Sequence, residues 1–411
     1  MRKLFPALAL VSMVALGAAQ PAGADPPFYK QRNLISDDTT LIPAEHRDGL
    51  LLNAWGLAAS ATSPWWIANN GSDSSILFNV TTGAIQSLVV AIPDGAPTGL
   101  VFNNSGGGFV VTSGASSAPA VFIFSSEAGV ISGWNPNVPP PAPSTQAQVG
   151  ATVADAIYKG LAIAGTGADA RLYATNFHAG TVDIFDNAYT LLALPGAFVD
   201  PNLPVGYAPF GIQNINGTLY VTYALQDDDA EDDVAGPGNG FVDAYDTAGK
   251  LLRRVASRGS LNSPWGLALA PADFGAFSNK LLVGNFGDGR INAYDLSEST
   301  STGEAVAVGP LHSAKGPPIE IEGLWALQFG NGAGAGPKNT LFFTSGPFDE
   351  AHGLFGSLEP TGPPGHNKLP IASGSPTARR RHVASPSRPA IRYARSTSSA
   401  LLARTCSARS S

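Results

Sequence analysis

The stretch Pro264-Trp265-Gly266-Leu267-Ala268 places one glycine inside a short apolar run, and this phrase returns along the chain. The copies are Trp55-Gly56-Leu57, Thr98-Gly99-Leu100, Lys159-Gly160-Leu161, Phe210-Gly211-Ile212, Trp265-Gly266-Leu267 and Glu322-Gly323-Leu324. A repeat of roughly 40–60 residues built from short apolar segments is typical of a β-propeller. The sequence therefore predicts six blades, each with a Gly-Leu or Gly-Ile run as its innermost strand. Glycine there would let neighbouring backbones approach closely around the axis.

A second strand-like segment follows each of these runs. The segments are 66–69, 109–112, 172–176, 219–222, 281–285 and 341–344. A third, alternating segment often ends in an aromatic residue and aspartate, as at Phe185-Asp186, Tyr245-Asp246 and Tyr294-Asp295. Outer strands are the most variable, with examples at 129–134 and 250–254, and a proline-rich loop at 136–150 is expected between the second and third blades. We predict an all-β fold of six four-stranded blades.

The last repeat lacks a convincing fourth strand, and an open ring would leave exposed strand edges. The run Phe28-Tyr29-Lys30-Gln31-Arg32-Asn33-Leu34-Ile35 is strand-like and has no repeat of its own. We expect it to pair with the segment at 353–358, which would complete the sixth blade and close the ring.

Composition separates three regions of the chain. Arg2 and Lys3 precede an apolar run and the small residues Ala22-Gly23-Ala24, which predicts a signal peptide over 1–24 and a secreted protein, periplasmic or extracellular. No later apolar run is long enough to span a bilayer. The propeller is expected over 25–362, and residues 363–411 read as a disordered Arg/Ser-rich tail. Two interpretations of this tail remain open. It is either a basic segment that binds an anionic surface or a C-terminal end that is not homologous to the rest of its family.

Charge and cysteine content exclude several functions. Eight of the 24 basic residues lie beyond position 378, so the rest of the chain has 16 basic residues against 31 acidic ones. Such an acidic body argues against nucleic acid as a partner. A single cysteine, Cys406, excludes an internal disulfide and a cysteine metal site. We expect a monomer.

Several longer phrases resemble a known family. They are 262–268 around Trp265-Gly266, 284–293 (GNFGDGRINA), 232–243 (DDVAGPGNGFVD) and 352–356 (HGLFG). They are similar to a family of uncharacterised secreted bacterial proteins with an NHL-like six-bladed propeller. The resemblance runs from about 29 to 358 and implies the fold. It implies no activity and no catalytic residues.

Two sets of loops should open on one face of such a ring. They are the loops leading into the inner strands and the loops between second and third strands. Their polar residues are candidates for the mouth of the central channel: Asn69, Lys159, Asn176, His178, Asn285, Asp288, Glu322, Asp349 and His352. Each asparagine alone is as readily a turn former, and a lone loop histidine is more often solvated than functional.

An acidic insert interrupts the fourth repeat. Asp227, Asp229, Glu231 and Asp233 alternate in it, and a set of carboxylate oxygens suits Ca²⁺. The insert lacks the glycine and distal glutamate of an EF-hand loop. It is therefore either a calcium site or a solvated loop.

Three functions fit the sequence to different degrees. The preferred one is a non-catalytic binding scaffold for an unknown extracellular or envelope ligand, because the common nucleophile-elbow, P-loop and H-E-x-x-H motifs are absent. The alternative is a calcium-dependent lactonase- or esterase-like hydrolase at the channel mouth. A quinone-dependent sugar dehydrogenase fits less well, because the propeller region is poor in arginine and histidine.

The tail is expected to be dispensable for stability. It has no periodic apolar pattern, so it cannot bury enough surface to offset the entropy of ordering it. A chain ending near Pro363 should keep the thermal midpoint of the full mature chain in calorimetry. A drop of several degrees would show instead that the tail packs on the ring.

Overall fold

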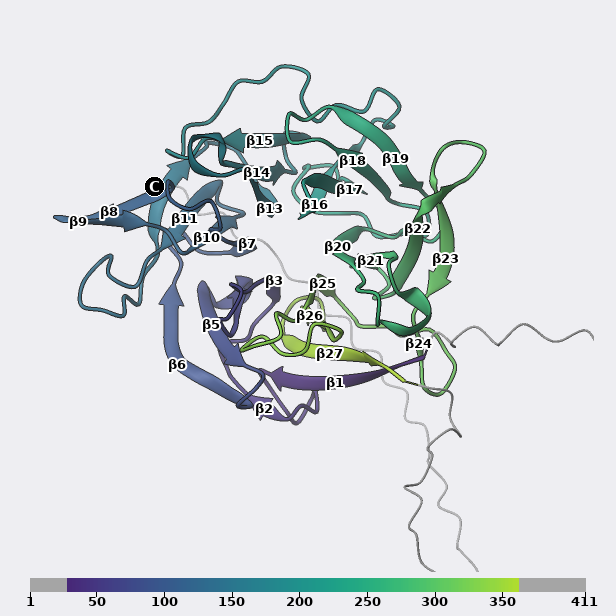
Figure 1. Cartoon of the computed structure of the whole chain (residues 1–411), viewed down its shortest axis with the longest axis horizontal. Coiled ribbons are helices and arrows are strands. Elements are labelled where there is room, and N and C mark those ends of the chain that lie inside the picture. The colour runs from purple at the N-terminus through teal and green to yellow at the C-terminus, as the bar shows by residue number, and fades with distance from the viewer. Residues whose placement is uncertain (1–27, 362–411) are drawn as a thin grey trace, which may run out of the picture. The chain divides into compact units, whose positions relative to one another are not determined.

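The computed structural model describes residues 28–361, which form six small sheets around a central axis (Figure 1). The predicted signal peptide (1–24) and tail (363–411) lie outside these residues. The first blade contains β3 (Ala54–Ala58), β4 (Trp65–Asn69), β5 (Ser74–Asn79) and β6 (Ala84–Ala91). The second contains β7 (Pro97–Phe102), β10 (Phe122–Ser126), β11 (Val130–Trp134) and β12 (Gln148–Thr152). The third contains β13 (Tyr158–Ala164), β14 (Arg171–Asn176) and β15 (Thr181–Phe185).

The other three blades follow in chain order. The fourth contains β16 (Tyr207–Ile215), β17 (Thr218–Leu225), β18 (Phe241–Tyr245) and β19 (Leu251–Ser257). The fifth contains β20 (Pro264–Leu269), β21 (Leu281–Asn285), β22 (Ile291–Ser299) and β23 (Ala305–Pro310). The sixth contains β25 (Leu324–Phe329), β26 (Leu341–Ser345), β27 (Leu354–Pro360) and β1 (Phe28–Ser36). The predicted all-β, six-bladed ring is confirmed.

Smaller elements decorate this frame. The short strands β2 (His46–Arg47) and β24 (His312–Ser313) pair with β1 in parallel. Three single-turn 3₁₀ helices span Asn70–Ser72, Gly167–Asp169 and Gly275–Phe277. Within residues 28–361 there is no helix long and apolar enough to cross a membrane.

The inner strands contact one another in the order β3, β7, β13, β16, β20, β25 and back to β3. Adjacent blades bury apolar clusters between their faces. Trp66 stacks on Phe122 between the first two blades, with ring centroids 4.3 Å apart. Because each sheet is covered on both faces, its central strands can be buried throughout, as β26 is.

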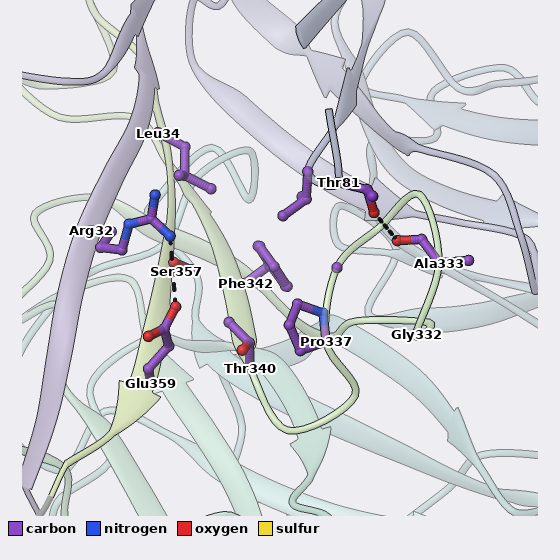
Figure 2. A pocket seen from close by; sticks show the side chains of 12 residues that line it. Arg32, Leu34, Thr81, Gly332, Ala333, Pro337, Thr340, Phe342, Ser357 and Glu359 are labelled. Carbon is purple, nitrogen blue, oxygen red and sulfur yellow. Dashed lines mark hydrogen bonds and ion pairs between the residues drawn. The ribbon is translucent and has the colours of Figure 1, made fainter. Parts of the chain in front are cut away.

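The N-terminal strand closes the ring as predicted. β1 pairs antiparallel with β27 from Tyr29–Pro360 to Ser36–Leu354. A groove of about 370 Å³ lies beside this closing strand, where Leu34 and Phe342 come from the same buried cluster (Figure 2). Arg32 on its rim lies 3.7 Å from Glu359 of β27.

Three details of the repeat prediction are wrong. In the second blade the segment predicted as the second strand, 109–112, overlaps β8 (Val110–Ser113), which pairs only with β9 (Ser116–Pro119) in a separate hairpin. The true second strand is β10, so 130–134 is the third strand and the proline-rich loop lies within this blade. The hairpin has the same β-rich composition as a blade strand, which is why the two could not be told apart.

The sixth and third blades depart as well. In the sixth, Trp325-Ala326-Leu327 occupies the place of the repeated phrase, and Gly323 lies in the preceding turn with φ of 62°. In the third, a single bridge between Phe185 and Leu191 replaces an outer strand within the described residues.

The repeated glycine is required by the close approach of neighbouring inner strands. A Cβ on Gly266 would lie 2.5 Å from the backbone oxygen of Trp325 in the next blade. A Cβ on Gly160 would similarly lie 3.0 Å from the oxygen of Phe210. Alanine is accommodated at the equivalent position of the sixth blade, Ala326, where the backbone N–H binds the hydroxyl of Thr344.

Gly266→Val is therefore expected to lower the free energy of unfolding by about 3 kcal/mol or more, because overpacking alone costs about 1–3 kcal/mol and backbone cannot move aside as a side chain can. Gly49→Val is the matched control, since a Cβ at Gly49 has nothing within 4 Å. Chemical denaturation of both variants measures the difference. Equal stability of the two would contradict the close-approach explanation.

Candidate functional site

In five of the six inner strands, the residue at the position before the repeated glycine contributes to a cluster at the centre of the ring. These residues are Trp55, Lys159, Phe210, Trp265 and Trp325. The hydroxyl of the sixth residue, Thr98, instead bonds to Tyr158 O in the next blade. The rings of Trp55 and Trp325 stack at 3.6 Å, and Phe286 stacks on the other side of Trp325 at 4.1 Å. These aromatic residues form a plug beneath the loop face, which is the face carrying the loops between second and third strands.

Lys159 is the cation in this plug. Its side chain is only 3% exposed, and its Nζ donates to Glu127 and, at 3.0 Å, to Asp232. The ammonium also lies 5.4 Å from the centre of the Trp55 ring. Burial disfavours the charged form of Lys159, but the two carboxylates outweigh it and raise its pKa. The lysine is therefore held protonated, as a donor rather than a nucleophile.

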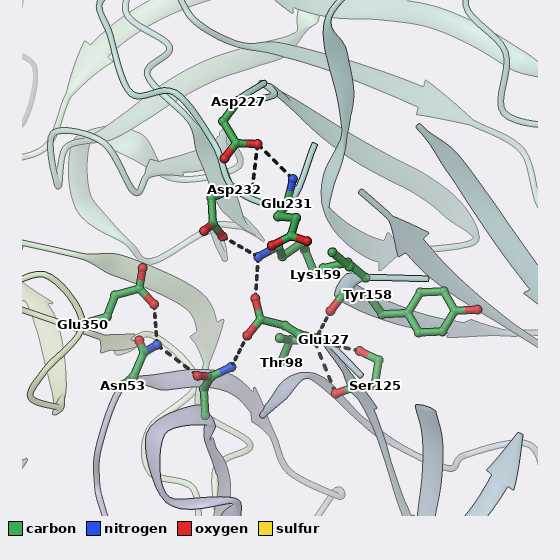
Figure 3. A network of polar contacts seen from close by, with 12 residues as sticks. Asn53, Thr98, Ser125, Glu127, Tyr158, Lys159, Asp227, Glu231, Asp232 and Glu350 are labelled. Carbon is green, nitrogen blue, oxygen red and sulfur yellow. Dashed lines mark hydrogen bonds and ion pairs between the residues drawn. The ribbon is translucent and has the colours of Figure 1, made fainter. Parts of the chain in front are cut away.

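A chain of hydrogen bonds continues from Lys159 across the loop face (Figure 3). Asn70 Nδ2 donates to Glu127 Oε2 at 2.9 Å, and Asn53 Nδ2 donates to Asn70 Oδ1 at 3.3 Å. Asn53 also donates to Glu350, and its Oδ1 accepts from Trp325 Nε1 at 3.0 Å. Side chains from the first, second, third, fourth and sixth blades thus join in one network above the plug.

Glu350 ends this network in an unusual backbone segment. Phe348, Asp349 and Glu350 have φ of 59°, 51° and 64°, a left-handed conformation that non-glycine residues rarely adopt in succession. Burial, with repulsion from Glu127 added, raises the pKa of Glu350 to about 7, although the hydrogen bond from Asn53 opposes the shift.

A cavity of about 420 Å³ adjoins Glu350 on the loop face, and we call it the acidic pocket. Five carboxylates from loops of the fifth and sixth blades line it: Asp288, Glu320, Glu322, Asp349 and Glu350. Phe286 lines the same pocket and connects it to the aromatic plug. Ala235, which follows Asp233 and Val234 of the acidic insert, also lines the pocket.

Only one of these five acids has a basic partner within residues 28–361. Glu320 pairs with Arg290 at 2.7 Å. Glu322 accepts the backbone N–H of Phe348 at 2.9 Å, and Asp288 accepts from Asn285 Nδ2 at 3.0 Å. The pocket consequently carries an excess of negative charge.

The predicted acidic insert does not converge on one point. Asp227 accepts backbone N–H groups of Glu231 and Asp232, whereas Asp229 and Glu231 are exposed. Asp233 faces inward, and burial raises its pKa to about 6. Within residues 28–361, no three acidic or histidine side chains are grouped as metal ligands. Calcium binding therefore stays a prediction, without a ligand set in the insert.

The other predicted residues divide between the pocket and local turns. Asp288, Glu322 and Asp349 line the acidic pocket, and Lys159 lies at the centre of the network. The remaining five have local roles or lie exposed. Asn69 binds Ser74, Asn176 binds Asp183, Asn285 binds Asp288, His352 binds Asp37 and His178 is exposed.

Two partners of Lys159 were not among the predicted site residues. Glu127 follows β10, so the misplaced second strand of that blade hid its position on the loop face. Asp232 interrupts the alternation 227, 229, 231, 233 on which the calcium prediction rested. The turn Glu127-Ala128-Gly129 between two alternating apolar runs was the available signal for the first.

Two sequence relatives cover most of this chain. An uncharacterised protein of Acanthamoeba polyphaga mimivirus is 33% identical over 343 residues, which are 80% of this chain and 80% of that protein. A second uncharacterised mimivirus protein is 32% identical over 347 residues, 80% of this chain and 85% of its own length. The chain belongs to the family of these proteins. The relatives are viral, whereas the resemblance implied a bacterial family. No protein-family model matches the chain.

Solved structures of similar fold are more distant. Virginiamycin B lyase from Staphylococcus aureus aligns with a TM-score of 0.45 and 13% identity, covering 80% of this chain and 99% of that chain. A soluble aldose sugar dehydrogenase from Escherichia coli aligns with a TM-score of 0.46 and 12% identity, covering 81% and 100%. Likenesses this distant assign no chemistry to this chain.

The two ion pairs of Lys159 should differ in their contribution to stability. Lys159→Met leaves Glu127 partly buried without its cation, so we expect the free energy of unfolding to fall by about 2–4 kcal/mol. Asp232 is 76% exposed, so Asp232→Asn should cost less than about 1 kcal/mol. Urea denaturation of the two variants checks this order, and the reverse order would contradict it.

Proposed function

We propose that this chain is an exported, non-catalytic binding protein and that its acidic pocket binds a cationic ligand. The observation that carries the proposal is the pocket itself. It combines a volume of about 420 Å³ with carboxylates from loops of two blades and one aromatic side chain. Concave sites with a few convergent polar groups are where small ligands usually bind.

Charge selects the class of ligand. Asp288, Glu322 and Asp349 have no ion-pair partner among residues 28–361, and the body of the chain is acidic as a whole. A bound cation would relieve the repulsion among these groups, and the surrounding negative potential would speed its arrival.

The aromatic wall favours an organic cation, such as an amine or guanidinium. Phe286 lines the pocket with its ring backed by Trp325 at 4.1 Å. An ammonium or guanidinium placed against an aromatic face gains about 0.5–2 kcal/mol from the ring quadrupole. A ligand of this kind could contact the ring and the carboxylates together.

A binding role also agrees with the state of the central lysine. Lys159 donates to two carboxylates, which raise its pKa. A protonated amine has no lone pair with which to attack a substrate. Calcium-dependent hydrolysis is the alternative, and it requires divalent-ion binding on this face.

Titration calorimetry with agmatine, and separately with Ca²⁺, tests the proposal. We expect agmatine to bind, and Asp349→Asn or Glu322→Gln to weaken it about three- to ten-fold, as loss of one charged contact implies. Glu298→Gln is the control, because it removes the same charge at an exposed position outside the pocket. Equal weakening by the control, or no binding of agmatine, would contradict the proposal. Binding of Ca²⁺ alone would favour the hydrolase.

Binding should also depend on pH in a predictable direction. Glu350, with a pKa of about 7, loses its proton as pH rises from 6 to 8, so affinity for a cation should rise over that range. Glu350→Gln should flatten this dependence. In the free protein a raised carboxyl pKa has the opposite effect on stability: the folded state holds the extra proton, so stability falls as pH rises from about 4.5 to about 7. Thermal melts at several pH values measure the second effect.

A further inference from the structure

The channel has a second mouth, at the end of the inner strands that points away from the loop face. Each inner strand passes from the plug toward this end, so residues three positions after the plug lie near it. Here a cavity of about 200 Å³ is lined by Gln213, Gln328 and Asn104. We call it the amide mouth. It opens into a narrow channel to which each blade contributes a leucine or isoleucine: Leu57, Leu100, Leu161, Ile212, Leu267 and Leu327.

The amides at this mouth have free hydrogen-bonding capacity. Gln213 on β16 and Gln328 on β25 are half-buried, yet neither side chain makes a hydrogen bond to any residue from 28 to 361. Neighbouring Asn214 differs, because its Nδ2 donates to Ile163 O at 2.8 Å and its Oδ1 accepts from Gly217 N at 2.9 Å. Half-buried amides that the protein leaves unpaired are satisfied by water or by a ligand.

The lining also excludes charge. Among residues 28–361, no lysine, arginine, aspartate, glutamate or histidine lines either the amide mouth or the channel behind it. An ionised ligand would lose hydration there and find no counter-charge in the lining, which is costly. The preferred ligand is therefore neutral.

The combination of donors, acceptors and apolar wall narrows the ligand class further. Each glutamine amide offers two N–H donors and one acceptor oxygen. A hydroxyl group can accept a hydrogen bond from the amide N–H or donate one to the amide oxygen. Leu57 and Leu100 supply apolar surface beside the amides. A compact ring with hydroxyls at its edge and C–H groups on its face satisfies both parts of the lining. The cavity volume of about 200 Å³ suits a molecule of monosaccharide size.

We propose that the amide mouth is a second binding site, specific for a neutral polyhydroxylated ligand of monosaccharide size. Gln213 and Gln328 bind its hydroxyls from the fourth and sixth blades. The aromatic plug separates this site from the acidic pocket, so the two sites bind independently.

The test compares three probes that share one ring: methyl glucoside, which is neutral, glucuronate, which is anionic, and glucosamine, which is cationic. Saturation-transfer NMR and calorimetry with the full chain should show methyl glucoside binding at millimolar concentrations, and each charged probe binding at least ten-fold more weakly at this mouth. Gln213→Met and Gln328→Met should each weaken the neutral probe about five-fold, the loss expected for one hydrogen bond.

Controls separate this site from the acidic pocket. Gln86→Met alters a glutamine on β6 that is outside the amide mouth, and it should leave affinity for methyl glucoside unchanged. Glu350→Gln should likewise leave it unchanged while it alters agmatine binding. Glucosamine is cationic and could also enter the acidic pocket. If the Gln213→Met variant binds glucosamine and the Asp349→Asn variant does not, that binding is assigned to the acidic pocket. The proposal is overturned if no saturable binding of methyl glucoside occurs, if glucuronate binds equally well, or if both glutamine variants bind like the wild type.

Discussion

The close approach of six inner strands around one axis determines most of this structure. Where Gly266 faces Trp325, the carbonyl oxygen of the next blade occupies the space that a Cβ would need. The hydroxyl of Thr175 adds a bond to Phe210 O at 2.7 Å, and Thr98 binds Tyr158 O at 2.6 Å, so neighbouring blades are also joined by hydrogen bonds. The glycine turns its empty side to the neighbouring blade, and in five of the six blades the residue before it contributes to the plug. The repeat thereby determines which positions form the plug.

The plug gives the two ends of the channel different chemistry. Above it, Lys159 lies among Glu127, Asp232 and Glu350 and donates hydrogen bonds to the first two. Below it, six aliphatic side chains and neutral amides line the channel. Stacked indoles such as Trp55 on Trp325 leave little room for water between the two ends. The two ends of one channel therefore differ in charge: the loop face is ionised, and the amide mouth is neutral. The aromatic plug lies between them.

The sequence was sufficient for the ring but not for the site. The Gly-Leu phrases and the unpaired strand at 28–35 predicted the six blades and their closure, because both follow from local pattern and from the cost of an open edge. The site depends on which loops meet above the axis, and pattern alone does not contain that information. Glu127 was missed through one misplaced strand, and alternation in the insert suggested a calcium site although Asp227 and Asp233 turn to different surroundings.

The pKa of Glu350 depends on charged residues that other blades supply. Its pKa of about 7 arises from burial and from Glu127 and Asp232, carboxylates supplied by the second and fourth blades. Those two carboxylates are fixed by Lys159, which the third blade holds beneath them. A cation entering the acidic pocket would meet a carboxyl group whose charge is set by four blades together. Removing the charge of Glu127, Lys159 or Asp232 would therefore shift the pKa of Glu350, although each of these residues lies in a different blade from it.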